Sequence, residues 1–415
     1  MAELRRPRGN RLPRPPDDGP APNLFEPATP PPDTFVPPPP DTFPPPPPGT
    51  FAPPPPGPTA EPQTRRARSA QRREAAQGDR SGAAEPAGPG QELRGDRKGV
   101  HLIGLPLAGL LLLGWSATTL VGDVHWGPLS VLPVGLASIS PLVTLAAVPL
   151  VTLAIRARRW IPAVPAVLAA LLPWVFVLGY ASPAPQPTGA TLPLRAMIVT
   201  AHDGSADATD IADAVRDQKI DLLVVTELSA ALAHDLTAAG VTNRLTARWV
   251  QVPQPGDSPA AGMVIYSRFP IDGIIRLPGT HWPAVAGTVT VDNARFTLVV
   301  GHAVKPSMDH LDLWRSDLAA FGAAATIKGP VVVLANLNAT PWHPQFRRLV
   351  GGRLHDAGDV LGRGLRPTWP SWGLPLLPTD HALVAGGVGV DDLDTTGIGG
   401  SDHRALTVAL RIPVR

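Results

Sequence analysis

The sequence predicts an α/β domain with two packed sheets in the C-terminal half of the chain. Between about Leu194 and Arg415, many apolar runs of strand length alternate with a few amphipathic segments of helix length. This region has roughly 220 residues, which is enough for a substantial hydrophobic core. Many strands with few helices are typical of an α/β architecture that contains two sheets.

The elements of this domain follow in order along the chain. A strand at 194–201 precedes an amphipathic helix at 207–218, which turns Ile211 and Val215 inward. A fully apolar strand at 222–226 and a helix at 229–239 come next. The other predicted elements are one long helix at about 309–327 and strands at 263–267, 285–291, 295–301, 331–335 and 405–411.

Composition divides the 415-residue chain into regions that its averages conceal. The formal net charge is +2, and there is no cysteine, which excludes disulfides and thiolate metal sites. Half of the 54 prolines fall within residues 1–100, and the following stretch is mostly hydrophobic. We therefore predict four parts, namely a cytoplasmic tail at 1–100, transmembrane helices at 101–182, a linker at 183–193 and the α/β domain at 194–415.

The N-terminal tail lacks apolar periodicity. We predict that it is disordered, because it buries too little surface to offset the entropy of ordering. An eight-residue repeat carries Thr-Phe at 34–35, 42–43 and 50–51, each followed by a proline run that favours polyproline II. Such a segment is either a stiff spacer or a ligand for a proline-recognition protein. The end of the tail, from Arg65 to Lys98, is basic.

Three apolar stretches, at 102–121, 131–155 and 160–180, predict three transmembrane helices. Each is long enough to cross a hydrocarbon core about 30 Å thick. Basic residues precede the first stretch and fill the link between the second and the third, whereas the link between the first and the second has none. The positive-inside rule then places the N-terminus in the cytoplasm and the C-terminal domain outside the cell membrane. We expect Trp126 and Trp160 to be interfacial anchors.

Two Asp-His dipeptides carry the strongest chemical signal in the α/β domain. Asp402-His403 follows a Gly-Gly-Ser run, and Asp380-His381 lies upstream of it. An imidazole held by a carboxylate can stabilise or protonate a phosphoryl oxygen, and a second carboxylate can hold a hard cation. The two dipeptides together predict a phosphate-ester site. Each one alone is also explained as a turn cap in a surface loop before a strand.

Further polar residues end several predicted strands, which is where open α/β sheets place their sites. Glu227 ends one apolar run, His302 ends another, and Asn336 and Asn338 follow a third. Any one of them is explained as well by a loop cap. Their joint placement favours one common site.

Seven segments of residues 194–415 occur in an order that is specific to one family. They are DLLVVTE, AGMVIYSRFPI, LVVGHAV, VVVLANLNATPWHPQF, RPTWP, TDHALV and GSDHRAL. In this order they resemble the endonuclease/exonuclease/phosphatase superfamily. The resemblance implies a four-layered α/β sandwich that cleaves phosphate esters in nucleic acids, phosphoinositides or sphingomyelin. It also implies a divalent metal, Mg²⁺ or Mn²⁺, that acts as Lewis acid and template for in-line attack by water.

The resemblance assigns a role to individual residues. Glu227 and Asp402 match acids at the metal, His302 matches a histidine that contacts the phosphate, and Asn338 matches an asparagine that binds or orients it. His403 matches the catalytic histidine.

Asp380 matches the carboxylate that orients the ring of this histidine, but two other positions depart from the family pattern. Asn336 stands where the family has an aspartate that positions or deprotonates the attacking water, and an amide is not a base. His202 stands where the first strand usually ends in an asparagine near the metal, and imidazole favours Zn²⁺ or Mn²⁺ over Mg²⁺. Both remain candidate site residues, Asn336 for catalysis and His202 for the metal.

These observations predict a membrane-anchored, extracytoplasmic, metal-dependent phosphoesterase. The two departures leave a second hypothesis, in which a catalytically degenerate domain on the same anchor binds a phosphate-bearing ligand or a protein. A third hypothesis gives the main role to the tail as a cytoplasmic scaffold. The α/β domain has no Lys/Arg tract and no interleaved aromatic platform, which disfavours nucleic acid as the substrate.

Overall fold

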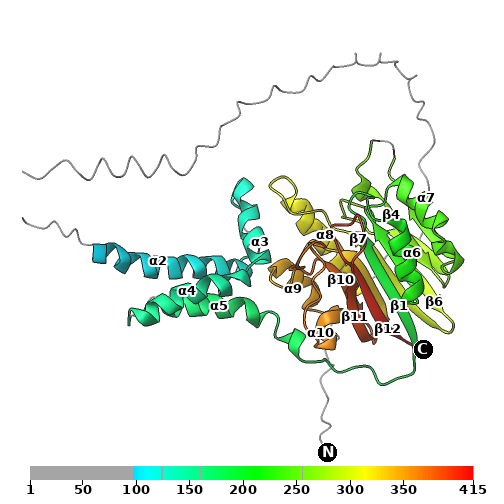
Figure 1. Cartoon of the computed structure of the whole chain (residues 1–415). Coiled ribbons are helices and arrows are strands. Elements are labelled where there is room, and N and C mark those ends of the chain that lie inside the picture. Colours follow the sequence, from blue (N-terminus) through cyan, green and yellow to red (C-terminus); the bar gives the residue numbers. More distant parts are fainter. Residues whose placement is uncertain (1–96, 123–124, 159, 162, 255, 415) are drawn as a thin grey trace, which may run out of the picture. The chain divides into compact units, whose positions relative to one another are not determined.

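The computed structural model describes residues 97–122, 125–158, 160–161, 163–254 and 256–414 (Figure 1). These residues belong to one compact unit, Asp96–Arg415. The predicted disordered tail, its Thr-Phe repeat and nearly all of its basic end lie outside the described residues.

The first of the two sheets has the strand order β11-β12-β1-β2-β4-β3. β1 (Thr191–Thr200) is parallel to β2 (Leu222–Thr226) and antiparallel to β12 (Ala405–Pro413). The sheet is therefore mixed. Its other strands are β3 (Ala247–Gln251), β4 (Met263–Ser267) and β11 (Gly389–Thr396).

The second sheet has the strand order β5-β6-β7-β8-β10-β9. β7 (Ala294–His302) is parallel to β8 (Val331–Asn336), and β10 (Asp380–Ala385) is antiparallel to β8. This sheet is also mixed. Its other strands are β5 (Ile271–Arg276), β6 (Ala284–Val291) and β9 (His355–Asp356).

Hydrophobic side chains between the sheets and outside them create four layers. Because side chains alternate along a strand, Ile198 faces the second sheet while Met197 faces the helices outside the first. α6 (Ala208–Asp217) and α7 (Ala230–Ala238) cover the first sheet. On the outer face of the second sheet lie α8 (Leu311–Ala323) and α9 (Pro344–Val350), and α10 (Ala357–Leu361) packs at one end of the core.

The observed elements confirm the predicted α/β class with two packed sheets flanked by helices. The strands predicted at 222–226 and 263–267 have those bounds, and the helix predicted at 207–218 is α6. Its N-cap, Asp207, accepts hydrogen bonds from two backbone N–H groups of the first turn, and Ile211 and Val215 are buried. The long helix at 309–327 was predicted too long, since α8 ends at Ala323 and a 3₁₀ turn follows.

Asp380 and His381 were predicted to lie in a loop. This prediction was wrong, because both residues belong to the fully buried strand β10. Strands β3, β5, β9 and β11 were also missed. Most of their residues are partly or fully exposed, so they lack the continuous apolar run by which the other strands were found.

The apolar segment before the sandwich folds into α2 (Arg97–Ala117), α3 (Val131–Ser138), α4 (Leu142–Arg156) and α5 (Ala163–Val175). Within the described part of the chain, no single helix has both the length and the apolar character needed to cross a membrane. One bent pair, Gly127–Ser138 with Leu142–Arg156, meets these criteria when its two helices are taken together, with an angle of 76° between them.

The stretch predicted as one span at 131–155 therefore needs a correction, since it is two helices. The break lies at Ile139–Pro141, between the C-cap of α3 and the N-cap of α4.

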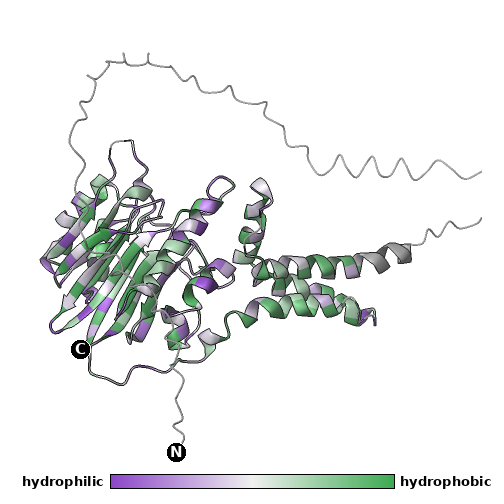
Figure 2. Cartoon of the chain, turned by 180° about the vertical axis from the view of Figure 1, so that it is seen from behind, coloured by the Kyte–Doolittle hydropathy of each residue, from purple (hydrophilic) through white to green (hydrophobic). Residues whose placement is uncertain are grey.

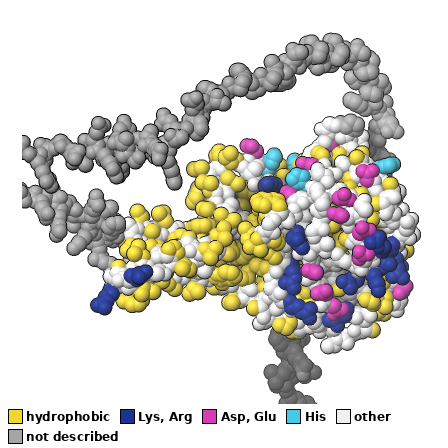
Figure 3. Space-filling view, in the orientation of Figure 1, with side chains coloured by type: hydrophobic (Ala, Val, Ile, Leu, Met, Phe, Trp, Pro, Cys, Tyr) yellow, Lys and Arg dark blue, Asp and Glu magenta, His cyan; other side chains and the backbone are white. Residues whose placement is uncertain are grey.

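The apolar helices contact one another through a few polar links and expose many large hydrophobic side chains. The Ser116 hydroxyl on α2 donates to the Ala169 carbonyl on α5 at 2.9 Å, and the Thr144 hydroxyl on α4 donates to the Ala170 carbonyl at 3.0 Å. Figure 2 shows predominantly hydrophobic residues along these helices, and Figure 3 shows hydrophobic side chains over most of their visible face. Exposed residues include Leu107, Leu111, Leu145, Leu153, Leu168 and Leu171.

Residues 340–350 of the sandwich hold the apolar helices through hydrogen bonds to backbone carbonyls. The Trp342 indole N–H donates to the Pro173 carbonyl at 3.0 Å, and the Gln345 amide donates to the Gly122 carbonyl at 2.7 Å. Pro173 lies in the last turn of α5, where carbonyls have no partner within the helix, and Gly122 lies just after the 3₁₀ turn Thr118–Leu120.

His343 makes a third such link, to α3. Burial lowers the pKa of His343 to about 4, so the ring is neutral at physiological pH. Its Nδ1 accepts the Thr340 N–H at 2.8 Å, which leaves the proton on Nε2 to donate to the Val134 carbonyl at 3.0 Å. The protonation state of His343 is thus set by its place between the sandwich and α3.

The contact of α8 with the second sheet gives a test of the fold. Phe321 is fully buried against this sheet, so Phe321→Ala is expected to lower the free energy of unfolding by about 3–5 kcal/mol. Leu313 lies on the same helix but is exposed, and Leu313→Ala should cost less than about 1 kcal/mol. Denaturant unfolding of both variants checks the expectation, and equal losses would contradict this packing.

Candidate active site

The candidate site lies where six strand ends meet at one edge of the two sheets. β1, β2, β7 and β8 end there. β12 and β10 begin there, because each is antiparallel to a neighbour that ends at this edge. The register places both His302 of β7 and Asp380 of β10 opposite Asn336 of β8. A pocket of about 610 Å³ opens at this edge, and its lining includes His202, Asp203, Glu227, His302, Lys305, Asn336, Asn338, Asp402 and His403.

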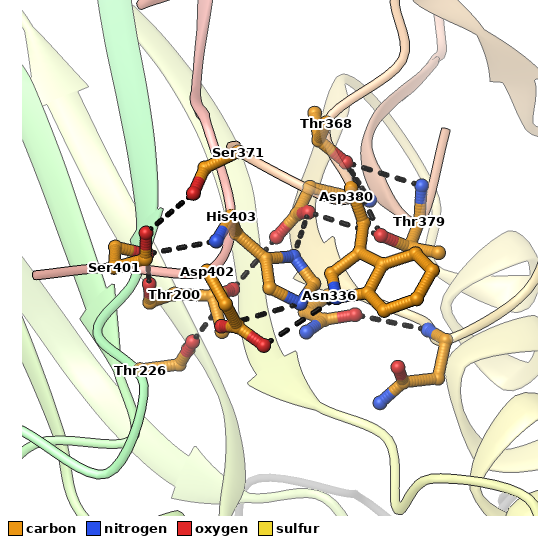
Figure 4. Close-up of polar contacts among 12 residues, drawn as sticks. Thr200, Thr226, Asn336, Thr368, Ser371, Thr379, Asp380, Ser401, Asp402 and His403 are labelled. Atoms are coloured by element: carbon orange, nitrogen blue, oxygen red, sulfur yellow. Dashed lines mark hydrogen bonds and ion pairs between the residues drawn. The ribbon is translucent and has the colours of Figure 1, made fainter. Parts of the chain in front are cut away.

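Asp380 and His403 form a buried ion pair behind this pocket (Figure 4). His403 Nδ1 lies 2.7 Å from Asp380 Oδ2, and Asp380 Oδ1 accepts the Thr200 hydroxyl at 2.7 Å. Burial alone would lower the pKa of His403, but the charge and hydrogen bond of Asp380 outweigh burial and raise it. Burial alone would raise the pKa of Asp380, but His403 and nearby hydroxyl groups outweigh burial and lower it.

Each partner therefore favours the charged form of the other, and the pair stabilises the folded state between these two pKa values. The contribution of His403 is full below the pKa of an unfolded histidine and is lost as pH rises through its raised folded pKa. The contribution of Asp380 is full above the pKa of an unfolded aspartate and is lost as pH falls through its lowered folded pKa. His403 Nε2 remains available at the pocket, 4.0 Å from Asp402 Oδ1.

The Gly-Gly-Ser run before Asp402 fixes the loop that carries His403. The Ser401 hydroxyl donates to the Thr200 carbonyl at 2.6 Å and accepts the His403 N–H at 3.0 Å (Figure 4). Gly400 has a φ of +75°, and a Cβ there would collide with the Ser205 carbonyl oxygen. Glycine at this position lets the loop lie against the turn that follows β1.

Glu227 faces His302 on the opposite sheet. Glu227 Oε1 lies 3.3 Å from His302 Nε2, and Oε2 accepts the Asp203 N–H at 3.0 Å. Burial lowers the pKa of His302, so its ring is neutral. The same Nε2 also lies 3.2 Å from the Asn338 amide nitrogen, which only donates, whereas the Glu227 carboxylate only accepts, so these two contacts select opposite tautomers of the ring. His302 Nδ1 is buried and has no hydrogen-bond partner among the described residues.

The two asparagines of the Asn-Leu-Asn segment present amide groups at the same pocket. Asn338 Nδ2 donates to the Ala303 carbonyl at 2.9 Å and lies 3.2 Å from His302 Nε2. Asn336 Oδ1 accepts the Asn338 N–H at 3.0 Å, which fixes the orientation of the Asn336 amide. Asn336 Nδ2 is buried and has no partner within the described chain, so it is a donor that an anion in the pocket would satisfy.

Asp402 is held by a histidine and a tryptophan. Its Oδ1 lies 2.8 Å from His202 Nδ1, and its Oδ2 accepts the Trp369 indole N–H at 3.4 Å. The His202 side chain is 50% exposed, so solvent reaches it. The residue that departs from the family pattern at the end of β1 thus contacts an acid that the resemblance assigns to the metal.

Four site residues that are not glycine have positive φ angles. The values are +49° for His202, +53° for Asp203, +56° for Glu227 and +46° for Asn338. Side chains with a Cβ seldom occupy this region of the backbone map, and residues that do tend to lie at functional sites. The strained turns therefore support this edge as the site.

The family resemblance implies a divalent metal, which would need oxygen or nitrogen ligands from the side chains at the pocket. Among the residues that the structure describes, no three His, Cys, Asp or Glu side chains already converge on one point where a metal would bind. Glu227, Asp402 and His202 all line the pocket, and two carboxylates with one imidazole suit Mn²⁺. Mg²⁺ needs only one or two carboxylates, because it keeps several waters and binds substrate phosphate oxygens. The residues present fit such a partly hydrated ion.

The structure brings seven of the eight predicted site residues to one pocket, and the eighth, Asp380, lies behind His403. Their chemical roles stay predictions. The supporting hydroxyls of Thr200 and Ser401 were missed, because an isolated Thr or Ser in a sequence gives no such signal.

His381, of the second Asp-His dipeptide, does not join the site. Its Nδ1 lies 2.7 Å from Asp356 Oδ2, and its Nε2 lies 3.0 Å from the Ala339 carbonyl oxygen. Burial by itself lowers the pKa of His381, but the hydrogen bond and charge of Asp356 raise it overall. This buried pair holds the backbone directly after Asn338.

Residues 198–403 match the Endonuclease/Exonuclease/phosphatase family. No curated protein matches the chain.

Many solved structures match the chain. An endonuclease/exonuclease/phosphatase from Beutenbergia cavernae DSM 12333 is 20% identical over 53% of this chain and 72% of its own, with a TM-score of 0.42. D. rerio TDP2 complexed with single strand DNA product is 15% identical over 52% of this chain and 98% of its own, with a TM-score of 0.42. A mannosyl-6-phosphatase from Bacteroides thetaiotaomicron VPI-5482 is 14% identical over 52% of this chain and 99% of its own, with a TM-score of 0.41.

The Asp380–His403 pair gives a test by titration. In Asp380→Asn the carboxylate that raises the pKa of His403 is gone while the burial that lowers it remains, so this pKa should fall below its ordinary value. NMR titration of the histidine ring measures the change. Asp235 is exposed beside His234 on α7, and Asp235→Asn should leave His403 unchanged. A His403 pKa that stays raised in Asp380→Asn would contradict the ion pair.

Proposed function

Because residues 198–403 carry a domain of the endonuclease/exonuclease/phosphatase family, we propose that this protein hydrolyses phosphate esters. The carrying observation is the buried Asp380–His403 pair, whose free imidazole nitrogen reaches a pocket that also contains Glu227 and a buried unpaired donor at Asn336. An imidazolium and amide donors stabilise the negative charge that grows on the phosphoryl oxygens.

Each residue has a distinct part in the proposed reaction, in which water attacks phosphorus as the ester oxygen leaves. His403 Nε2 carries a proton toward the phosphoryl group, and Asp380 keeps the ring charged and oriented. The amide N–H groups of Asn336 and Asn338 bind phosphoryl oxygens. Neutral His302 lies against Glu227 and Asn338 and keeps both at the pocket wall.

A divalent ion would be held by Glu227 and Asp402, with His202 as a third ligand. When bound, such an ion supplies a Lewis acid that polarises the phosphoryl oxygen. Asn336 replaces the family's aspartate, so the chain has no carboxylate at that position to take the proton of the attacking water. The proposed enzyme is therefore slower than a relative with aspartate there, because a general base contributes about 10² to 10⁴ in rate.

The proposal includes a membrane anchor in the apolar helices, with the N-terminus in the cytoplasm and the sandwich outside. The exposed leucines of α2, α4 and α5 support it, since an exposed apolar surface of this extent marks a membrane or partner contact. The positive charges before α2 and after α4 support the orientation. The tail, with its proline runs, would then meet a proline-recognition protein inside the cell.

The first test is hydrolysis of a generic diester, bis(4-nitrophenyl) phosphate, by the purified full chain with Mg²⁺ or Mn²⁺. We expect turnover that EDTA removes, and His403→Gln should reduce kcat by about 10² to 10⁴. His234 on α7 is highly exposed, so His234→Gln is the matched control and should retain full activity. The proposal fails if the wild-type chain is inactive across metals and phosphoester classes.

A second candidate function, a catalytically degenerate domain that binds phosphate-bearing ligands, is favoured by the joint change at His202 and Asn336. The double variant His202→Asn with Asn336→Asp restores the family pattern and separates the two. If the wild type is active, we expect the double variant to be faster by about 10² or more, because a base is restored. Activity that appears only in the double variant would favour the degenerate domain instead.

A further inference from the structure

The site pocket has a wall that lies outside the family domain. Gly135, Ser138 and Ile139 of α3 and its C-terminal end line the same pocket as His202, Glu227 and His403. His343 fixes this wall, since its Nε2 lies 3.0 Å from both the Val134 carbonyl and the Ser138 hydroxyl. A segment of the apolar helices is thus built into the site.

Two loops of the sandwich that line the pocket expose large apolar side chains. The loop at 303–310 exposes Met308, and the loop at 369–377 exposes Trp372 at 73%, Leu374 at 76% and Leu376. Among the described residues of 179–414, the only other exposed large hydrophobic residues are Ile275 and Leu313. The exposed apolar residues of the sandwich are therefore concentrated at the pocket.

The pocket wall formed by α3 also exposes large apolar side chains. Leu132 and Leu136 are exposed on α3, and Leu136 adjoins the pocket residue Gly135. We call Met308, Trp372, Leu374 and Leu376, together with Leu132 and Leu136, the apolar rim.

The angle between α3 and α4 suits a lipid surface. Residues Gly127–Ser138 are bent by 76° from α4. If α4 enters a bilayer along its normal, α3 lies nearly parallel to the surface. Apolar residues of interfacial segments enter the boundary between head groups and acyl chains, and tryptophan is favoured at that depth. The pocket would then open at the level of lipid phosphate groups.

We propose that the substrate is a phosphoester of a membrane lipid, whose head group enters the pocket while the apolar rim contacts the bilayer. This inference rests on the proposed hydrolase activity and names its substrate class. Lys305 in the pocket lining adds a positive charge beside the histidines, which complements a lipid phosphate. Hydrolysis consumes one water, breaks one P–O ester bond and gives an alcohol and a phosphate product.

The test compares two substrates with the full chain reconstituted in vesicles. One is phosphatidylglycerol mixed into phosphatidylcholine vesicles, with products followed by ³¹P NMR, and the other is soluble bis(4-nitrophenyl) phosphate. The rim variant Trp372→Ser with Leu374→Ser alters neither the catalytic residues nor the pocket lining. Ile275 is 38% exposed on edge strand β5, and Ile275→Ser is the control.

We expect the rim variant to lower the rate on vesicle lipid by roughly tenfold or more, because two large apolar side chains no longer enter the bilayer. Its rate on the soluble diester and its thermal unfolding midpoint should match those of the wild type. Ile275→Ser should match the wild type on both substrates.

Three outcomes would overturn the inference. If the wild type cleaves the soluble diester or an oligonucleotide but neither vesicle phospholipid, the hydrolase proposal stands and the lipid inference fails. If the rim variant loses both activities equally, the rim acts on folding or chemistry and not on lipid contact. If the wild type cleaves nothing, the proposed function fails as well.

Discussion

The buried Asp380–His403 ion pair joins the two sheets at the edge where the site lies. Asp380 begins β10 of the second sheet, whereas His403 lies two residues before β12 of the first, and Thr200 at the end of β1 donates to the same carboxylate. The chemistry of the site therefore depends on how the sheets pack. A shift of one sheet against the other would break the pair and leave a buried charge without a partner, which is strongly unfavourable.

The pocket in front of this pair is richer in hydrogen-bond donors than the family pattern implies. Asn336 places an amide donor where the pattern has an acid, and His202 holds Asp402. Relative to that pattern, the change at 336 removes one negative charge from the pocket. In our proposal this change favours binding of an anion, while activation of water loses a base.

The apolar helices and the sandwich are linked through backbone carbonyls. Trp342 and Gln345 donate to carbonyls at or just beyond the ends of helical segments, whereas His343 donates to the Val134 carbonyl within α3. This attachment also shapes the site, because His343 fixes α3 as a wall of the pocket. The segment that contacts lipid in our proposal and the segment that shapes the site are the same.

The sequence by itself determined the α/β class, most strand and helix positions and the group of polar residues at strand ends. These features are local, since buried strands such as β2 are continuous apolar runs and a side chain at a strand end is found by position alone. The tertiary structure decided which acid contacts which histidine, because Asp402 and His202 are 200 residues apart and only strand order brings them together. It also decided the break before α4 and the place of α3 at the pocket. A hydropathy pattern indicates how long an apolar stretch is but not the direction in which the chain runs.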